Sequence, residues 1–361
     1  MKKVLIANIF GIGDVLFTSP MIANLKRNDP DVKVDYVCNI RTMDIVNRLP
    51  GVDDIYVYEK DLFTQVWNES KIRFLKTTHN LFKEIKEQEY DVLFDLTLSR
   101  ELGLFFKLAG IKRRVGLDYK KRGVFLTDRI PFSGFNDKHV VEYYLDCLRH
   151  LKTDVTVKAM SLFSDEISQE IVLSHLREKG VDEMAGPLVG IVPGGGASWG
   201  NDASRKRWNA ESFAEVADAL MEKGSAVAIL GDKNEADLCR NITGRMKLKP
   251  VITSNNMILP DFIAFLNACD LVVCNDGGPL HMAGALGVRT VSVFGPVNEK
   301  VYGPYPASDD HIVIKGESLS CRPCYNSFRL PHCGNNNECL DGISAGQVTE
   351  ACLGLLDQVK P

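Results

Sequence analysis

The chain has 361 residues, of which 45% are hydrophobic and 25% charged, values that are ordinary for a globular protein and leave room for two domains. No apolar run approaches the roughly 20 residues that a transmembrane helix needs, and the short apolar N-terminus leads into a glycine loop rather than a cleavage site, so we expect a cytoplasmic protein. Residues 1–164 carry 26 Lys and Arg against 22 Asp and Glu, a bias too weak for a nucleic-acid-binding protein.

The first half of the chain alternates predicted strands with predicted helices. A buried strand is expected at residues 3–9, followed by a glycine loop at 10–14 and a helix at 15–27. Further strands are predicted at 33–38, 54–58, 90–96 and 113–116, residues 61–90 are predicted to be mostly helical and to end in a helix at 81–88, and further helices are predicted at 100–109 and 138–151. This alternation predicts one doubly wound α/β domain over residues 1–164.

A second alternation follows a helix predicted at residues 164–180. Strands are predicted at 188–192, 226–230, 271–274 and 290–294, and helices at 210–223, 234–245, 260–268, 280–286 and 344–359. We therefore expect a second α/β domain over residues 165–340 and a separate helical segment at 341–361.

The loop after the first strand, Gly11-x-Gly13-Asp14, fits a dinucleotide-binding fingerprint badly, because Leu16 replaces the third glycine. Asp14 places a carboxylate at the start of the next helix, where a phosphate would otherwise bind. The helix end favours the ionised form, so Asp14 could accept a proton from a substrate hydroxyl. A helix cap is the alternative, and the residues alone leave the two interpretations level.

The loop that begins Pro193-Gly194-Gly195-Gly196 also follows a strand, and it leads through Arg205-Lys206-Arg207 into a helix. Glycines let backbone amides approach phosphates, and a basic side chain at the end of the loop can pair with them. The Gly-Lys-Ser/Thr of a P-loop is absent. We interpret this loop as a phosphate site; a flexible loop with a solvated basic run is the alternative.

Residues 271–296 form a predicted strand, loop, short helix and strand. Asp276 and His281 fall at the carboxyl end of the first strand and the amino end of the helix, which is the ligand-binding end of such a unit. A tight turn with a satisfied Asp cap is the alternative interpretation.

Basic residues gather in two short runs, Lys112-Arg113-Arg114 and Lys120-Lys121-Arg122. Such runs are usually solvated, and contact with an anionic acceptor or a membrane surface is the alternative. Four of the ten cysteines, Cys321, Cys324, Cys333 and Cys339, have a spacing that resembles that of metal ligands. A structural zinc is one hypothesis for this cluster, and free thiols in an ordered loop are the other, since disulfides are not expected in a reducing cytoplasm.

Several stretches resemble glycosyltransferase family 9, the ADP-heptose:lipopolysaccharide heptosyltransferases. They are GIGDVLFTSPMIANLK, AGIKRRVGLDY, the segment from PGGGASWG to SRKRW, ILGDKNE and DLVVCNDGGPLHMAGALGVRTVSVFGP, and they follow the family's order over nearly the whole chain. The resemblance implies an α/β fold of GT-B type, with two Rossmann-like doubly wound domains that face each other across a cleft. It also implies that the C-terminal helix packs back on the N-terminal domain.

The resemblance implies an inverting, metal-independent transfer of a heptose from ADP-heptose to an anionic lipopolysaccharide inner-core acceptor, at the inner face of the membrane and with no required cofactor. Asp14 would be the general base. The donor would be bound by Lys206 at the diphosphate, Asp276 at the sugar hydroxyls, Gly277, Gly278 and His281 around the diphosphate, Glu235 at the ribose and Met257 near the adenine. The acceptor would be bound by Gly13, Lys112, Arg113, Arg114 and Lys120.

Three other functions compete with this one. A transferase that uses another nucleotide-sugar is favoured by the glycine after Asp276, where many relatives have Ser or Thr. A nicotinamide-dependent oxidoreductase is disfavoured by the incomplete fingerprint around Gly11. A non-catalytic nucleotide-sugar-binding protein would use the same donor residues without needing Asp14.

Overall fold

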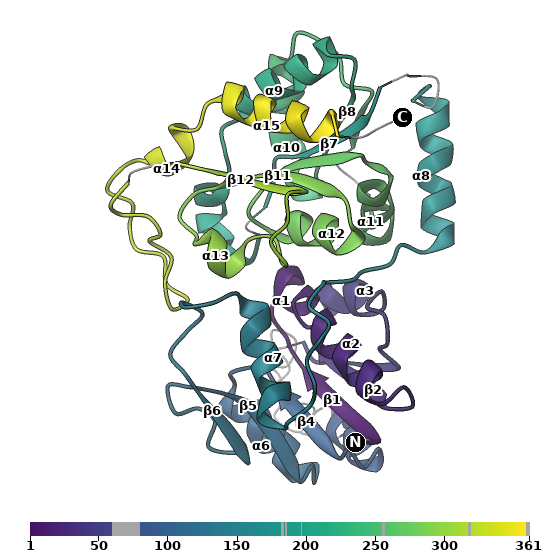
Figure 1. The fold of residues 1–361 in the computed structure, drawn as a ribbon, viewed down its shortest axis with the longest axis vertical. Coiled ribbons are helices and arrows are strands. Elements are labelled where there is room, and N and C mark those ends of the chain that lie inside the picture. The colour runs from purple at the N-terminus through teal and green to yellow at the C-terminus, as the bar shows by residue number, and fades with distance from the viewer. Residues whose placement is uncertain are drawn as a thin grey trace, which may run out of the picture. The chain divides into compact units, whose positions relative to one another are not determined.

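The computed structural model describes residues 1–59, 80–181, 184, 186–195, 197–254, 257–316 and 319–358. The chain divides into two compact units, Met1–Leu162 and Phe163–Pro361. The boundary between them lies two residues before the expected one. Each unit holds a six-stranded sheet with helices on both faces (Figure 1). The predicted pair of doubly wound domains is therefore confirmed. Most of the helical stretch predicted at 61–90 lies outside the described residues.

Unit 1 contains a parallel sheet with the strand order β3-β2-β1-β4-β5-β6. Its strands are β1 (Lys3–Ala7), β2 (Lys33–Cys38), β3 (Asp54–Val57), β4 (Val92–Asp95), β5 (Arg113–Tyr119) and β6 (Asp128–Phe132). Its helices are α1 (Ile12–Leu16), α2 (Ser19–Asn28), α3 (Met43–Val46), α6 (Arg100–Leu108) and α7 (Val140–His150), together with a helix at residues 80–87 and a 3-10 turn at Ile40–Thr42.

Two helices stand where one was predicted at residues 15–27. The first helix, α1, ends at Leu16, and α2 begins at Ser19 with Pro20 in its first turn. Proline lacks the N–H that a continuing helix would need, but it is well suited to a first turn, where that N–H has no partner. The chain therefore restarts its helix at this point.

Unit 2 contains a parallel sheet with the strand order β12-β11-β10-β7-β8-β9. Its strands are β7 (Leu188–Val192), β8 (Ala226–Leu230), β9 (Ile252–Ser254), β10 (Leu271–Asn275), β11 (Arg289–Phe294) and β12 (His311–Lys315). Its helices are α8 (Glu166–Glu178), α9 (Ala210–Glu222), α10 (Ala236–Arg245), α11 (Leu259–Ala268), α12 (Gly278–Leu286), α13 (Glu299–Tyr302), α14 (Glu338–Asp341) and α15 (Ala345–Leu356), with 3-10 segments at Ala197–Lys206 and Lys233–Glu235.

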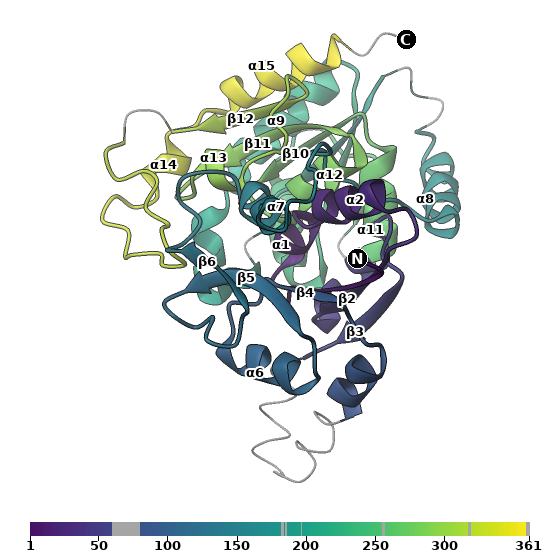
Figure 2. The same ribbon diagram turned by 60° about the horizontal axis from the view of Figure 1, so that its bottom comes forward.

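The C-terminal helix α15 contributes to the core of unit 2. The described part of α15 packs against α9 and against β10, β11 and β12 of its own unit, as Figures 1 and 2 show. Val348, Cys352 and Leu355 are buried in the same core cluster as the inner face of the sheet. The apolar face of α15 thus covers one side of the unit 2 sheet, so α15 is part of the core of unit 2. The packing of the C-terminal helix on the N-terminal domain stays a prediction.

The strands that the sequence pattern missed all lie at sheet edges. They are β6, which carries Pro131, β9, which has three residues with Ile252 buried and Thr253 exposed, and β12, none of whose residues is fully buried. An edge strand buries less apolar surface and tolerates proline, so its sequence lacks the continuous apolar run of a central strand. Among the described residues, no helix is both long enough and apolar enough to cross a membrane.

Candidate active site

The loop between β1 and α1 lies at the centre of the unit 1 sheet. The strands β1 and β4 are neighbours there, and the strand order reverses between them, so the loops that follow them leave the sheet in opposite directions. Ligands of doubly wound sheets bind at this switch point, outside the carboxyl ends of the strands. Gly13 and Asp14, both predicted site residues, therefore occupy the binding edge of unit 1.

Two buried asparagines hold this loop in shape. Asn8 Nδ2 donates to the backbone oxygen of Asp14 at 3.0 Å. Asn39 Nδ2 donates to the backbone oxygens of Ile9 and Phe10, at 2.7 Å in both cases. The sequence analysis missed both asparagines, although each follows directly after an apolar strand, where a polar residue signals the ligand-binding edge.

Asp14 is the third residue of α1, and Gly11 is the cap. The N–H of Gly11 donates to Asp14 Oδ2 at 3.3 Å, so the carboxylate helps to close the start of the helix. This contact does not exclude a role as a base, because a carboxylate has two oxygens and several lone pairs. The two interpretations of Asp14 are thus compatible in this geometry.

Asp95 ends β4 beside this loop, and the sequence analysis did not single it out. Its side chain is buried, and its Oδ1 accepts hydrogen bonds from the Thr97 backbone N–H at 3.1 Å and from the Thr97 hydroxyl at 2.6 Å. Burial outweighs these two bonds and raises the pKa of Asp95 to about 6. Asp95 lines a small pocket with Ser99, Arg122 and Phe125.

The raised pKa predicts that Asp95→Asn gains stability relative to the wild type as the pH rises. Between about pH 4 and pH 6 the native carboxyl keeps a proton that the unfolded chain has released, so wild-type stability falls as the pH rises through this window. A difference of about two pKa units corresponds to about 3 kcal/mol of unfolding free energy. Urea unfolding followed by circular dichroism, at about pH 4 and about pH 7, measures the difference between the two proteins.

Asp91→Asn is the matched control for this prediction. The backbone N–H groups of Lys2 and Lys3 donate to Asp91 and lower the pKa of its carboxyl. That contribution is already present above the unfolded-state pKa of about 4 and is lost only below it, so the difference between Asp91→Asn and the wild type should change little between the two pH values. A pH-independent difference between Asp95→Asn and the wild type would contradict the assignment.

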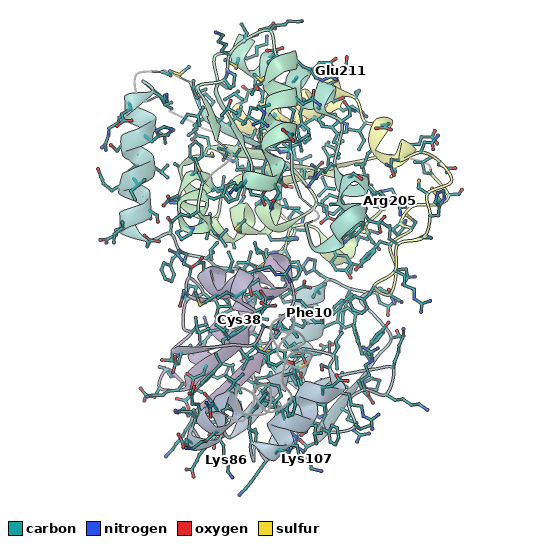
Figure 3. All side chains as sticks on the ribbon, turned by 180° about the vertical axis from the view of Figure 1, so that it is seen from behind. Phe10, Cys38, Lys86, Lys107, Arg205 and Glu211 are labelled. Atoms are coloured by element: carbon teal, nitrogen blue, oxygen red, sulfur yellow. The ribbon has the colours of Figure 1, made fainter. Side chains whose placement is uncertain are left out.

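The two basic runs lie at opposite ends of strand β5 in the unit 1 sheet. Lys112, Arg113 and Arg114 stand at the amino end of β5, and Lys120 follows its carboxyl end. Seven residues at about 3.3 Å each separate the two ends by about 20 Å. Figure 3 shows Phe10 and Cys38 toward one end of unit 1 and Lys107 at the other end. Of the predicted acceptor residues, Gly13 and Lys120 lie at the same end of the sheet as Asp14, and Lys112, Arg113 and Arg114 lie at the other end.

Two of the predicted acceptor residues are engaged within unit 1. The Arg113 guanidinium pairs with Asp128 at 3.1 Å. The Arg114 guanidinium donates to the backbone oxygen of Phe125 at 2.6 Å and to that of Ile111. Lys112 and Lys120 are exposed. The two arginines thus stabilise the amino end of β5, which is the end of the sheet away from Asp14.

In unit 2 the switch point lies between β7 and β10. Asn275, the last residue of β10, ties the two loops there together. Its Nδ2 donates to the backbone oxygens of Pro193 and Gly194, at 2.7 and 3.0 Å, and its Oδ1 accepts from the Trp208 backbone N–H at 2.9 Å. Asn275 is buried and was also missed, although a polar residue ends an otherwise apolar strand.

The Glu235 carboxylate accepts a hydrogen bond from the glycine loop. Its Oε1 accepts from the Gly195 N–H at 2.9 Å and its Oε2 from the Asp232 N–H at 3.2 Å, and the Arg207 guanidinium lies 3.5 Å from Oε1. A Cβ at Gly194 would lie 1.9 Å from Oε1. Glycine is therefore required at position 194 by the close approach of a carboxylate.

Lys206 and Asp276 meet in a buried ion pair. Lys206 Nζ lies 2.6 Å from Asp276 Oδ2, and the side chains are 10% and 5% exposed. The lysine comes from the segment after β7 and the aspartate from the loop after β10, so the fold brings together two residues that are 70 positions apart in the sequence. A cation and a carboxylate at one switch point can together bind an anionic group and a hydroxyl group.

The other predicted donor residues lie in α12 and in the connection between β9 and α11. Gly277 and Gly278 form the start of α12, whose backbone N–H groups point out of the helix end, as an anion site requires. His281 is buried within α12, and Met257 is half-buried in the connection between β9 and α11. The glycines are thus placed to contact an anion through the backbone.

The four clustered cysteines line one pocket, together with Arg205 and Asn337. All four are free thiols, and the Asn337 N–H donates to Cys333 Sγ at 3.3 Å, which contributes to a lowered pKa of that thiol. Within the described part of the chain, no set of three or more His, Cys, Asp or Glu residues is arranged to hold a metal ion. The structural zinc therefore stays a hypothesis, and no step below relies on a metal.

A family model described as "Glycosyltransferase family 9 (heptosyltransferase)" matches residues 78–329. "Lipopolysaccharide heptosyltransferase 3" of Escherichia coli is 26% identical over 301 residues, which cover 81% of this chain and 83% of that protein. The family 9 glycosyltransferase of Veillonella parvula DSM 2008 has a similar structure, with a TM-score of 0.81 at 23% identity over 99% of this chain and 97% of that one. ADP-heptose lipopolysaccharide heptosyltransferase II of E. coli gives a TM-score of 0.76 at 20% identity over 99% of each chain. These similarities confirm the predicted fold class.

Proposed function

The chain belongs to glycosyltransferase family 9 (heptosyltransferase), and on that basis we propose that it transfers a heptose from ADP-heptose to an anionic acceptor of the lipopolysaccharide inner core. The name of one structural relative contains this donor, and the names of both E. coli relatives contain lipopolysaccharide. The observation that carries the proposal is the buried Lys206–Asp276 pair at the switch point of unit 2.

We propose that the donor binds at this switch point through its diphosphate. Lys206 and the backbone N–H groups at the start of α12 would neutralise the two phosphates, and Asp276 would accept hydrogen bonds from the sugar hydroxyls. Glu235, which lies at the carboxyl end of β8 and is held by the backbone, would accept from a ribose hydroxyl, and Met257 would contact the adenine. The support for this arrangement is that Lys206, Asp276 and Gly278 follow two neighbouring strands at one sheet edge.

We propose an inverting displacement with Asp14 as the base. The acceptor oxygen forms a bond to the anomeric carbon, its proton passes to the Asp14 carboxylate, and the bond from that carbon to the phosphate oxygen breaks, so that ADP leaves with the electron pair. A single displacement inverts the anomeric centre. Charge develops on the leaving diphosphate, where Lys206 and the helix N–H groups stabilise it without a metal ion.

For the acceptor we propose an anionic, phosphorylated sugar at the inner face of the inner membrane. Lys120 is exposed on the same sheet edge as Asp14 and can attract such a group. Lys112 stands at the other edge and is assigned to no acceptor contact here.

A thermal-shift panel of nucleotides tests the donor. We expect ADP to raise the melting temperature, because a ligand at about 100 times its dissociation constant stabilises the native state by about 2.7 kcal/mol. UDP and GDP should shift the melting temperature much less. A preference for UDP or GDP would redirect the proposal to another nucleotide-sugar, and no response to any nucleotide would contradict a nucleotide-sugar donor.

A transfer assay distinguishes an enzyme from a binding protein. ADP-heptose and inner-core lipopolysaccharide from a heptose-deficient strain are incubated with the protein, and release of ADP is followed. We expect ADP release only when both substrates are present. Binding of ADP without release of ADP from the mixture would favour the non-catalytic alternative.

A further inference from the structure

An aromatic stack covers the ammonium group of Lys206. Nζ lies 4.4 Å from the centroid of the Trp199 ring, and that ring stacks on Tyr325 with 4.8 Å between centroids and 29° between planes. Tyr302 contacts Tyr325 edge-on, at 5.9 Å and 61°. The Lys206 ammonium therefore has Asp276 on one side and an indole ring on another.

The members of the stack come from three separate segments of unit 2. Trp199 belongs to the 3-10 segment after β7, Tyr302 ends α13, and Tyr325 belongs to the cysteine-rich segment after β12. Gly200 has a φ of +56°, a left-handed conformation that glycine adopts without strain, and it forms a kink in the 3-10 segment. This kink separates Trp199 from the turn that leads to Lys206, and the chain folds back so that the two side chains meet.

The position of Tyr325 is fixed by the backbone around it. The N–H groups of Cys324 and Tyr325 both donate to the Pro296 oxygen at 3.0 Å. The neighbouring Arg322 donates to the Gly295 oxygen at 2.7 Å. These acceptors directly follow β11, whose neighbour β10 leads into Asp276. The stack is thus anchored at the same sheet edge as the site that it contacts.

A lysine side chain has four rotatable carbon–carbon bonds, and an ammonium group on it has no preferred direction of its own. An indole face attracts a cation, and the attraction is strongest where water is excluded, as it is around the nearly buried Lys206. Trp199 therefore restricts the ammonium to one place, and Tyr325 prevents the indole from swinging away.

We propose that Trp199, supported by Tyr325, is a positioning residue that holds Lys206 where the donor diphosphate binds. The inference rests on the proposed function, because it takes the nucleoside diphosphate as the ligand of Lys206. Trp199 acts on the phosphates only through Lys206. It contributes to the affinity for a nucleoside diphosphate and not to the affinity for the nucleoside.

Isothermal titration calorimetry with ADP and with adenosine tests this selectivity on the full chain. We expect Trp199→Ala to weaken ADP binding by about 3- to 30-fold, the range that cation–π contacts span, and to leave adenosine binding within about twofold. Trp199→Phe keeps an aromatic face and should restore much of the ADP affinity. In a Lys206→Met background, Trp199→Ala should cause no further loss, because the cation is already gone.

The outcomes separate this proposal from the function on which it rests. Equal losses for ADP and adenosine, or a loss that persists in the Lys206→Met background, would show a general structural role and overturn the proposal. If Lys206→Met weakens ADP binding and Trp199→Ala does not, the stack proposal alone fails. If Lys206→Met leaves ADP affinity unchanged, the diphosphate assignment itself fails, and the stack proposal fails with it.

Discussion

Asp14→Asn is expected to lower kcat by about 10²- to 10⁴-fold, the usual contribution of a general base, and to leave ADP affinity within about twofold. Asparagine has the same shape, and its Oδ1 can still accept the hydrogen bond that the Gly11 N–H donates to the carboxylate at 3.3 Å. It cannot take a proton from the acceptor hydroxyl. The loss should therefore appear in turnover, measured as ADP release, while calorimetry shows intact ADP binding.

Asp44→Asn is a matched control for this substitution. Asp44 also lies in the first turn of a short helix of unit 1. Its carboxylate forms a long ion pair with Arg48, with 4.0 Å between the oxygen and the guanidinium nitrogen. It should retain wild-type turnover. If Asp14→Asn kept near-normal turnover, Asp14 would be a helix-closing residue only, and the general base would have to be sought elsewhere.

Gly194→Ala is expected to destabilise the protein by about 3 kcal/mol, the upper part of the range for overpacking a filled site. The new Cβ would lie 1.9 Å from Glu235 Oε1 and 2.0 Å from Glu235 Cδ. This carboxylate cannot turn aside without losing the N–H donors of Gly195 and Asp232. The loop should therefore move, and ADP affinity should fall at least about tenfold, equal to about 1.4 kcal/mol.

Two further variants check that the clash is the cause. Gly354→Ala changes a glycine of α15 that has nothing within 4 Å of its added Cβ, and helix propensity favours alanine there by about 1 kcal/mol. It should be neutral or stabilising in urea unfolding. Glu235→Ala in the Gly194→Ala background removes the clashing carboxylate and should restore part of the lost stability. Equal melting temperatures for Gly194→Ala and the wild type would contradict the close approach.

The central strands were predictable because burial on both faces leaves a continuous apolar run. The bounds of β7 and β8 agree with those expected from the sequence, Leu188–Val192 and Ala226–Leu230. The edge strands β6, β9 and β12 were missed for the opposite reason, since each is short and partly exposed, and β6 also includes a proline. The single helix predicted at 15–27 failed where Pro20 stops one helix and starts the next.

The candidate site was predictable only where the neighbouring residues in the sequence mark a residue as functional. Glycines and carboxylates that follow an apolar strand indicate a ligand-binding edge, and this pattern marks Gly13 and Asp14, the glycine loop at 193–196 and Asp276. The supporting asparagines were not found in this way. Asn275 donates a hydrogen bond to Pro193, 82 positions away, and Asn39 donates one to Ile9, 30 positions away. Such partners cannot be inferred from neighbouring residues.

Local patterns in this chain were sufficient for the α/β class, for two doubly wound halves and for the loops that carry Asp14, Lys206 and Asp276, because glycine spacing and apolar runs depend on near neighbours. Packing decided which of these residues meet. The extended strand β5 places Lys112 and Lys120 at opposite ends of one sheet, and its parallel pairing with β4 puts Lys120 at the end where Asp14 lies. The order of β7 and β10 joins Lys206 to Asp276, because strand order, unlike strand identity, is set by contacts between distant segments. The kink at Gly200 then brings Trp199 onto the same ammonium.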